Sequence, residues 1–326
     1  MKTRLILSIF AFIALAIGCA VASAQPYPSY PSKPVKLIVG YAPGGTPDVI
    51  ARVIGQKLST TLGQQFIVDN KSGAGGLVST QTVAKSPPDG YTLLVADIGQ
   101  LAISPFMFAN PGFDLMKDFA PITLVAVTPL FIAVNPNLKL TTFKDFVAYA
   151  KANPGKLSYG SAGIGSIHHI SMESLKADLA LDMAHVPYKG SGQSVPAFIA
   201  GDVQILAGAY PALRPAIDSQ RANLLAVTSL KRFSHQKTVP AVSEFVPGYD
   251  FPSEVGFLAP AGTPPEVIKR LNTAINDALK DPELLSRLEG LGSDALGTTP
   301  EAYSANLKAN LVKFQKAVKV SGAKAE

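Results

Sequence analysis

Between residues 35 and 62, apolar and polar positions follow first the pattern of a buried strand and then that of an amphipathic helix. Residues 35–41 form a mostly apolar run, which predicts a buried strand, and a Pro-Gly-Gly turn follows it. Residues 46–62 instead place apolar side chains three and four positions apart, which predicts an amphipathic helix. Thr46 is the expected N-cap of this helix, and Gly63 is its expected end.

The same order of elements recurs along the chain. Apolar runs at 66–68 and 91–96 flank a helical segment at 77–85. Further strands are expected at 157–160, 185–188, 203–206 and 224–228, and further helices at 143–152, 167–179, 265–279 and 303–318. Strands that alternate with helices predict an α/β fold in which helices cover parallel sheet.

The first 24 residues are expected to be a secretory signal peptide. Lys2 and Arg4 precede an apolar run at 5–17, and an Ala-Ser-Ala motif ends at Ala24. A membrane-spanning helix would need roughly 20 apolar residues, and this run is shorter. Cys19 lies in a segment that loosely resembles a lipoprotein box, so a lipid anchor is the lesser alternative. The mature chain is therefore expected outside the cytoplasm.

Composition narrows the classes of function. Removal of 24 residues from the 326-residue chain would leave 302 residues, with no cysteine and with a formal net charge of +4 in place of +6. Disulfides and thiolate metal sites are then excluded, and the absence of a dense Lys/Arg run excludes a nucleic-acid footprint. The length suggests about two domains.

Two glycine-rich turns, at 43–46 and 161–166, each lie between the end of a strand and the start of a helix. The first N–H groups of a helix have no acceptor within it, and glycine lets a ligand approach the backbone closely. Each turn is thus a candidate site for a carboxylate or phosphate group. The alternative is that the glycines only satisfy tight turns.

Cofactor and catalytic signatures are missing from the sequence. Neither turn continues as a nucleotide-binding motif, so no cofactor is expected. His168 and His169 point about 100° apart on a helix and are poorly placed to share one metal ion. His169 and Glu173 lie on one helical face, but a third ligand is not indicated, and a local ion pair is the favoured interpretation. No Gly-x-Ser-x-Gly motif appears.

Eight strings spread over nearly the whole mature chain carry a resemblance: PSKPVKLIV (31–39), YAPGGTPD (41–48), GAGG (73–76), PDGYTLL (88–94), KDFAPI (117–122), HVPYKG (185–190), LAVTS (225–229) and LAPAGTP (258–264). Together they resemble the Bug-type extracytoplasmic receptors of tripartite tricarboxylate transporters.

The resemblance implies a two-lobed fold like that of type II periplasmic binding proteins, with crossover strands and a ligand cleft. One lobe would comprise 25–130 plus 253–326, and the other 131–252. A solute carboxylate would be held between the two glycine-rich turns. The partners would be a small organic carboxylate or zwitterion and the membrane permease subunits of such a transporter.

Positions expected at the cleft depart from the usual pattern of that family. Asp97 and Gln100 replace frequent threonines, Gly208-Ala209 replace a frequent Asp-Asn pair ahead of Tyr210, and Glu254 replaces a frequent aromatic residue. Two carboxylates in a partly dry cleft would repel a second ligand carboxylate. We therefore expect a zwitterion, or a mono-anion with a donor-rich tail; the alternative is that both carboxylates are solvated groups at the rim.

The resulting prediction is a periplasmic, non-catalytic solute receptor that closes around its ligand. The predicted ligand-binding residues are Tyr41, Pro43, Gly44, Gly45, Thr46, Asp48, Asp97, Gly99, Gln100, Ser161, Ala162, Gly163, Gly165, Ser166, His169, Tyr188, Lys189, Gly208, Ala209, Tyr210 and Glu254. Two alternatives stay open, namely an exported α/β hydrolase and a ligand-sensing subunit for a membrane sensor kinase.

Overall fold

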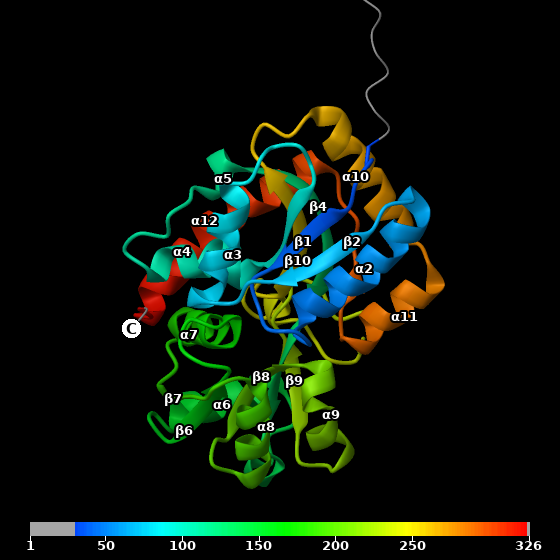
Figure 1. The fold of residues 1–326 in the computed structure, drawn as a ribbon. Helices are drawn as coiled ribbons and strands as arrows, with labels where there is room; N and C mark the ends of the chain where they lie inside the picture. Colours follow the sequence, from blue (N-terminus) through cyan, green and yellow to red (C-terminus); the bar gives the residue numbers. More distant parts are fainter. Residues whose placement is uncertain (1–29, 325–326) are drawn as a thin grey trace, which may run out of the picture. The chain divides into compact units, whose positions relative to one another are not determined.

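A computed structural model describes residues 30–324, so the predicted signal peptide and Cys19 lie outside the described residues. Contacts divide the chain into two units, Met1–Ser32 and Lys33–Glu326, and every element described below belongs to the second. Two separate β-sheets organise this unit (Figure 1). We call the elements of the six-stranded sheet the first lobe and those of the five-stranded sheet the second lobe.

The first sheet is mixed, whereas the sequence predicted parallel pairing. Its strand order is β11-β4-β10-β3-β1-β2, with bounds β1 Val35–Val39, β2 Phe66–Asn70, β3 Thr92–Asp97, β4 Phe119–Thr128, β10 Ser253–Pro260 and β11 Asp294–Ala295. β1 pairs in parallel with β2 and β3, while β10 runs antiparallel to β3 and β4. The antiparallel strand arises because the chain re-enters this sheet after building the second lobe.

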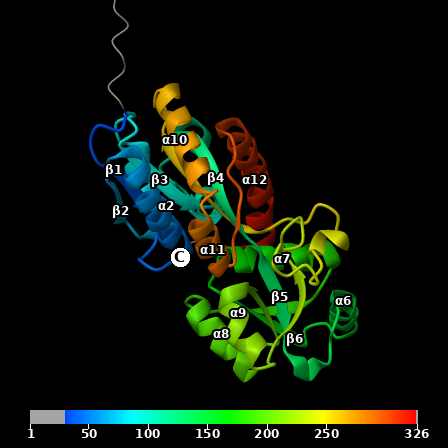
Figure 2. The ribbon, with the colours of Figure 1, turned by 90° about the vertical axis from the view of Figure 1, so that its right-hand side faces the viewer.

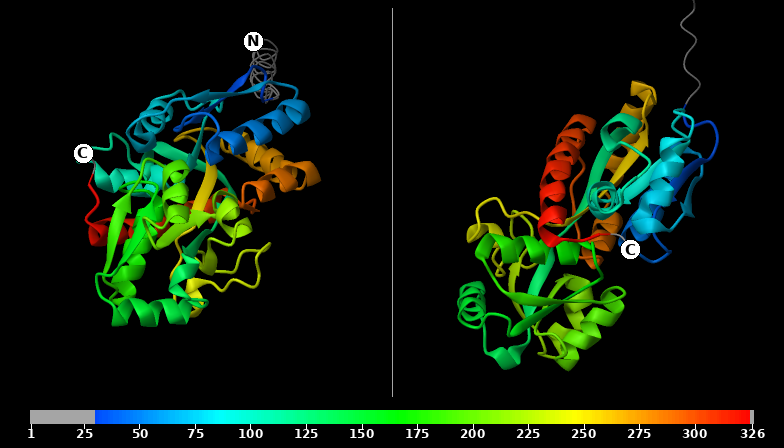
Figure 3. Two further views of the ribbon diagram at one scale, coloured as in Figure 1. Left: turned by 90° about the horizontal axis from the view of Figure 1, so that it is seen from below. Right: turned by 90° about the vertical axis from the view of Figure 1, so that its left-hand side faces the viewer.

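Helices cover both faces of the first sheet. They are α2 Thr46–Leu62, α3 Leu77–Ala84, α4 Ser104–Met107, α5 Leu115–Asp118, α10 Pro265–Ala278, α11 Pro282–Gly290 and α12 Pro300–Ser321, with short helices η1 Ala74–Gly76 and η2 Gly99–Ile103. α2 contacts α10 and α11, and the three lie side by side in Figures 2 and 3. Tyr303 and Leu307 of α12 pack with Val83 of α3 and Leu94 of β3 in one apolar cluster.

The start of α2 differs from the prediction in one detail. Gly45, not Thr46, is the N-cap, and no side chain caps this end. The helix ends as predicted at Gly63, whose left-handed conformation lets its N–H reach the Ser59 carbonyl.

The second sheet is also mixed. Its order is β7-β6-β8-β5-β9, with bounds β5 Leu130–Val134, β6 Leu157–Ser161, β7 Met183–Pro187, β8 Ile205–Ala209 and β9 Asn223–Val227. Its helices are α6 Phe143–Ala152, α7 Ile167–Leu179, α8 Ser191–Ala200 and α9 Tyr210–Asp218, with short helices η3 Pro136–Leu138 and η4 Val242–Glu244. Side chains of β5 alternate between two apolar clusters, Ile132 and Val134 facing α6 and α7, and Phe131 and Ala133 facing α8 and α9.

The chain crosses between the sheets twice. Pro129 separates β4 from β5, and residues 228–252 connect β9 to β10. An apolar cluster continues across the junction, because Phe314 and Val318 of α12 share it with Ile170 of α7 and Ile103 of η2. The two-lobed fold is thus as expected, while the lobe boundaries at 130/131 and 252/253 stay a prediction. Within residues 30–324, no helix is long and apolar enough to cross a membrane.

Candidate functional site

A cavity of about 640 Å³ opens between the second-lobe turn and the first lobe. The second lobe supplies the β6–α7 turn and the end of β7. The first lobe supplies the ends of β1 and β3, residues of η1 and η2, and both ends of α4. The lining residues are Tyr41, Gly75, Asp97, Gly99, Ser104, Met107, Phe108, Ala162, Gly163, Ile164, Gly165, Ser166, Ile167, His168, Pro187, Tyr188, Lys189 and Lys324. This volume suits a small organic molecule.

The second-lobe turn presents a helix N-terminus to this cavity. Ser166 is the N-cap of α7, and its hydroxyl accepts the His169 N–H at 3.3 Å. Ile167 and His168 are the first two helical residues, and N–H groups at these positions have no acceptor within the helix. Both residues line the cavity. Their N–H groups, with the positive end of the helix dipole, form a site suited to an anion.

The ring of His169 stabilises the β6–α7 turn. It is 4% exposed, and its Nδ1 accepts the Gly165 N–H at 3.1 Å. Its ring stacks on His185 with centroids 4.0 Å apart, and His185 stacks in turn on Tyr159 at 4.8 Å. Burial lowers the pKa of His169 and lowers that of His185 to about 4, so both rings are neutral near pH 7. The ring of His169 therefore holds the turn in place and does not line the cavity.

Ser161 and His185 meet one distance requirement of a hydrolase. Ser161 Oγ lies 2.7 Å from His185 Nε2, which is within reach for a nucleophile and a base. However, Ser161 is completely buried and lies outside the cavity lining, and its oxygen accepts the Gly163 N–H at 3.1 Å. In this conformation the hydroxyl stabilises the turn and cannot reach a substrate.

The first-lobe turn is arranged differently from the prediction of an open anion site. Asp48 is 2% exposed, and its carboxylate accepts the Gly44 N–H at 2.9 Å. It also accepts bonds from Arg52 Nε at 3.0 Å and Asn70 Nδ2 at 2.9 Å. Burial alone would raise the pKa of Asp48, but these three hydrogen bonds outweigh it and lower the pKa. The Asp48 carboxylate thus already accepts a main-chain N–H of this turn, as a bound anion would.

Tyr41 is the residue through which the first-lobe turn reaches the cavity. Pro43 and Gly44 are exposed, and along with Gly45 and Thr46 they lie outside the cavity lining. The two turns predicted to grip one headgroup are therefore not equivalent, since the second contributes main-chain donors and the first contributes a phenol.

Tyr41 and Asp97 form a polar pair on the first-lobe wall. The Tyr41 hydroxyl donates to Asp97 Oδ1 at 2.7 Å, and the Gln100 N–H donates to the same oxygen at 2.9 Å. Burial raises the pKa of Asp97 although these hydrogen bonds lower it, and burial together with Asp97 raises the pKa of Tyr41. Gly99 leaves room for the pair, because a Cβ there would lie 3.2 Å from Asp97 Oδ1.

Gln100 and Glu254 lie outside the cavity lining. The Gln100 amide is fully buried and donates to Ser79 and Thr80 of α3 at 2.9 and 2.7 Å. Glu254 accepts from Asn306 and Asn310 of α12 at 3.3 and 2.8 Å, and burial raises its pKa.

The second-lobe residues Gly208, Ala209 and Tyr210 lie at the end of β8 and the start of α9, away from this cavity. Tyr210 lines a different cavity of about 630 Å³, beside His235 and Glu289. Of the residues that departed from the expected family pattern, the structure brings only Asp97 into the lining of the 640 Å³ cavity.

Sequence reasoning missed part of the cavity wall. Ser104, Met107 and Phe108 come from a segment with no motif, and Lys324 follows the last helix. His168 was not among the predicted ligand-binding residues. Its place two residues after the Ser166 cap was the available indication that it borders the turn.

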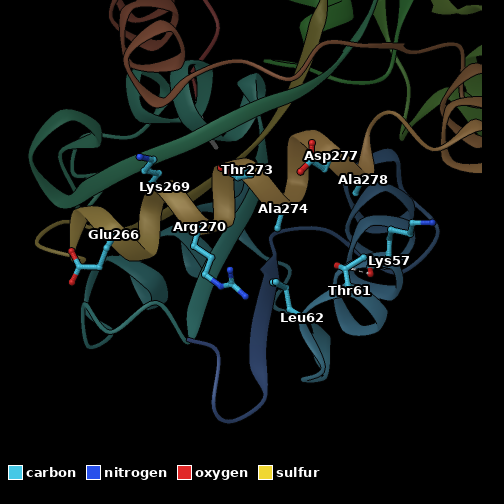
Figure 4. Close-up of a pocket in the computed structure, with 10 residues that line it drawn as sticks. All are labelled: Lys57, Thr61, Leu62, Glu266, Lys269, Arg270, Thr273, Ala274, Asp277 and Ala278. Atoms are coloured by element: carbon cyan, nitrogen blue, oxygen red, sulfur yellow. Dashed lines mark hydrogen bonds between the residues drawn. The ribbon is translucent and has the colours of Figure 1, made fainter. Parts of the chain in front are cut away.

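Another cavity, of about 540 Å³, lies on the outer side of the first lobe between α2 and α10. Figure 4 shows charged side chains along its rim, including Lys57 of α2 and Glu266, Lys269 and Arg270 of α10. The first turn of α10 borders it through Glu266, but no glycine of residues 30–324 lines it, and the acidic Glu266 side chain disfavours an anion at that helix start. Among residues 30–324, no group of three His, Cys, Asp or Glu side chains is close enough to hold a metal ion.

Comparison with known proteins identifies the family. The model of the "Tripartite tricarboxylate transporter family receptor" matches residues 50–319. The chain belongs to this family. A relative from Pseudomonas sp. (strain P51), the UPF0065 protein in the tcbD-tcbE intergenic region, is 35% identical over 95% of this chain and 93% of its own length. Family members are periplasmic solute-binding receptors.

Solved structures share the fold over most of the receptor. A periplasmic transporter protein is 38% identical with a TM-score of 0.76, covering 90% of this chain and 99% of that one. Rpa4515 of R. palustris, solved with adipate, is 32% identical with a TM-score of 0.77, covering 90% and 99%. MatC of Rhodopseudomonas palustris, solved with malate, is 27% identical with a TM-score of 0.72, covering 89% and 100%.

Proposed function

We propose that this receptor captures a small carboxylate-bearing solute in the 640 Å³ cavity and presents it to the permease of a tripartite tricarboxylate transporter. One observation carries the proposal: Ile167 and His168, whose main-chain N–H groups have no acceptor within α7, line that cavity. They suit the carboxylate group, which adipate and malate share in the related structures.

The charged side chains of the cavity favour one orientation of the bound ligand. Lys189 and Lys324 line it together with the α7 turn, while Asp97 lies on the first-lobe wall. A carboxylate is favoured near the lysines and the helix start, and an ionised Asp97 would repel a second one. We therefore propose a ligand with one carboxylate at the α7 end and a hydrogen-bond donor or ammonium group at the Asp97 end.

A dicarboxylate is the second candidate. Related receptors were solved with adipate and with malate, which are both dicarboxylates. The raised pKa of Asp97 favours its protonated form, which does not repel a second carboxylate. Protonated Asp97 could donate a hydrogen bond to the second carboxylate instead of repelling it.

Closure and delivery belong to the same proposal. A ligand that contacts both lobes stabilises the closed arrangement relative to the open one, and a permease can distinguish the two. We propose a cleaved leader at 1–24, a periplasmic location, and lobes divided at 130/131 and 252/253. A membrane sensor kinase remains the alternative partner, and the buried position of Ser161 argues against the hydrolase.

Thermal-shift screening followed by isothermal titration calorimetry tests the proposal. The panel comprises adipate, malate, matched monocarboxylates and matched ω-amino acids, each measured with the wild type and with Asp97→Asn. We expect an ω-amino acid to lose affinity in Asp97→Asn; a gain in dicarboxylate affinity in this variant supports the ionised-Asp97 model. Failure of every carboxylate to bind the wild type would overturn the proposal, and turnover of a panel member would favour an enzyme.

A further inference from the structure

His168 differs sharply from its neighbour His169. It is the second residue of α7 and lines the cavity, whereas the ring of His169 is buried beneath the turn. Successive helical side chains point about 100° apart, so one ring faces inward and the other faces the cavity. The adjacent histidines therefore have separate roles.

The two ring nitrogens of His168 are in different environments. Nδ1 is completely buried and has no hydrogen-bond partner among the described residues. Nε2 also has no protein partner in residues 30–324, but it is not buried. Since the side chain is partly exposed where it lines the cavity, Nε2 is the nitrogen available to a solute.

Burial of Nδ1 determines where the single proton of the neutral ring resides. A neutral imidazole has one N–H donor and one acceptor nitrogen. Buried donors without partners are rarer in proteins than under-satisfied acceptors, so the Nε2–H form is favoured. Loss of hydration lowers the pKa of His168 to about 4, which keeps the ring neutral near pH 7.

We propose that His168 is a specificity-determining residue that donates its Nε2–H to an oxygen of the bound solute. The oxygen belongs to the carboxylate held at the start of α7 or to a substituent on the adjacent carbon. This inference rests on the proposed function and adds a neutral side-chain donor to the main-chain donors of the turn. It predicts a preference for solutes with an acceptor oxygen at this position over those with a methyl or ammonium group there.

Nitrogen-15 NMR of the free protein tests the tautomer without any ligand. The chain has four histidines, so His168→Gln assigns the His168 signals by their loss. We expect the Nε2–H tautomer at pH 7. Observation of the Nδ1–H tautomer, or of a charged ring, would overturn the proposal.

Calorimetry tests the contact itself, with whichever of adipate, malate or the matched monocarboxylates binds the wild type. His168→Phe keeps an aromatic ring without a donor, and we expect its affinity to fall about 10- to 100-fold, as for loss of a neutral donor to a charged acceptor. His168→Gln retains a donor and should recover much of that loss. His235→Gln is the matched control, because His235 is exposed and lines the separate 630 Å³ cavity.

The outcomes separate this inference from the proposed function. Wild-type binding with His168→Phe unchanged in affinity would overturn the role of His168 alone. Absence of wild-type binding to any carboxylate would overturn the proposed function, while the tautomer measurement would still decide whether a donor faces the cavity. An equal loss in both His168 variants, without a change in unfolding midpoint, would show that shape and not donation is recognised, and would also overturn the role.

Discussion

Substitution of Gly165 by alanine probes the point where the two lobes touch at the cavity. Gly165 has φ +74°, and a Cβ built there would lie 2.1 Å from Met107 Sδ and 2.3 Å from Met107 Cε. Met107 belongs to α4 of the first lobe, while Gly165 belongs to the second-lobe turn. The change therefore strains both the backbone of the turn and the contact between lobes.

The cost of the backbone strain and the cost of the Met107 contact can be estimated separately. A left-handed conformation costs an L-residue about 1–2 kcal/mol, and this cost falls on the folded turn in any lobe arrangement. Atoms in van der Waals contact lie about 3.5–4.0 Å apart, so the Met107 terminus must move. Because methionine is flexible, displacement to a poorer rotamer costs only about 0.5–1.5 kcal/mol. The second cost applies only when the lobes are in contact, so it weakens ligand binding by about 2- to 10-fold.

Urea unfolding and calorimetry measure the two costs on Gly165→Ala, Met107→Ala and the double variant. We expect Gly165→Ala to lose about 1–2 kcal/mol of unfolding free energy, which Met107→Ala does not restore. Removal of the Met107 terminus should restore the part of ligand affinity that Gly165→Ala loses. Full stability in Gly165→Ala would refute the left-handed turn, and equal affinity losses in the single and double variants would refute the contact.

Two further predictions concern the buried carboxylates. Asp48→Asn should cost about 1–2 kcal/mol at pH 7, reduced from a fully buried pair because Arg52 is half exposed. The pKa of Asp48 is lowered by folding, so its contribution is present above the unfolded pKa of about 3.9 and is lost as pH falls, and wild-type and variant urea midpoints should converge toward pH 3. Glu254→Gln should leave ligand affinity unchanged. Burial raises the pKa of Glu254, so the wild type should gain stability relative to this variant as pH falls from 7 toward 5; no change in the difference would contradict this.

Local sequence patterns predicted most helices and several strands, because their signals are local. α6 and α7 begin and end where the sequence predicted, since Thr142 and Ser166 cap them and the apolar spacing continues to their ends. The antiparallel strands β4, β5 and β10 were not predicted. Their partners lie far away in the chain, and β4 carries Pro121 within it, which argues against a strand in a local reading.

The chemistry of the two glycine-rich turns was predicted only in part. Sequence indicated that both expose helix N-termini, but not that one turn already holds an internal anion. Asp48 accepts from Gly44 and His169 accepts from Gly165, each four residues after the donor. An acceptor side chain at that spacing was visible in the sequence, whereas its direction depends on packing against Arg52 and His185.

A crystal structure of the receptor with bound carboxylate tests the central claim most directly. The account predicts carboxylate oxygens about 2.7–3.2 Å from the main-chain N–H groups of Ile167 or His168, inside the 640 Å³ cavity. Two results would contradict it: a solute bound in the 540 Å³ cavity between α2 and α10, or a solute in the 640 Å³ cavity whose only carboxylate lies beside Asp97.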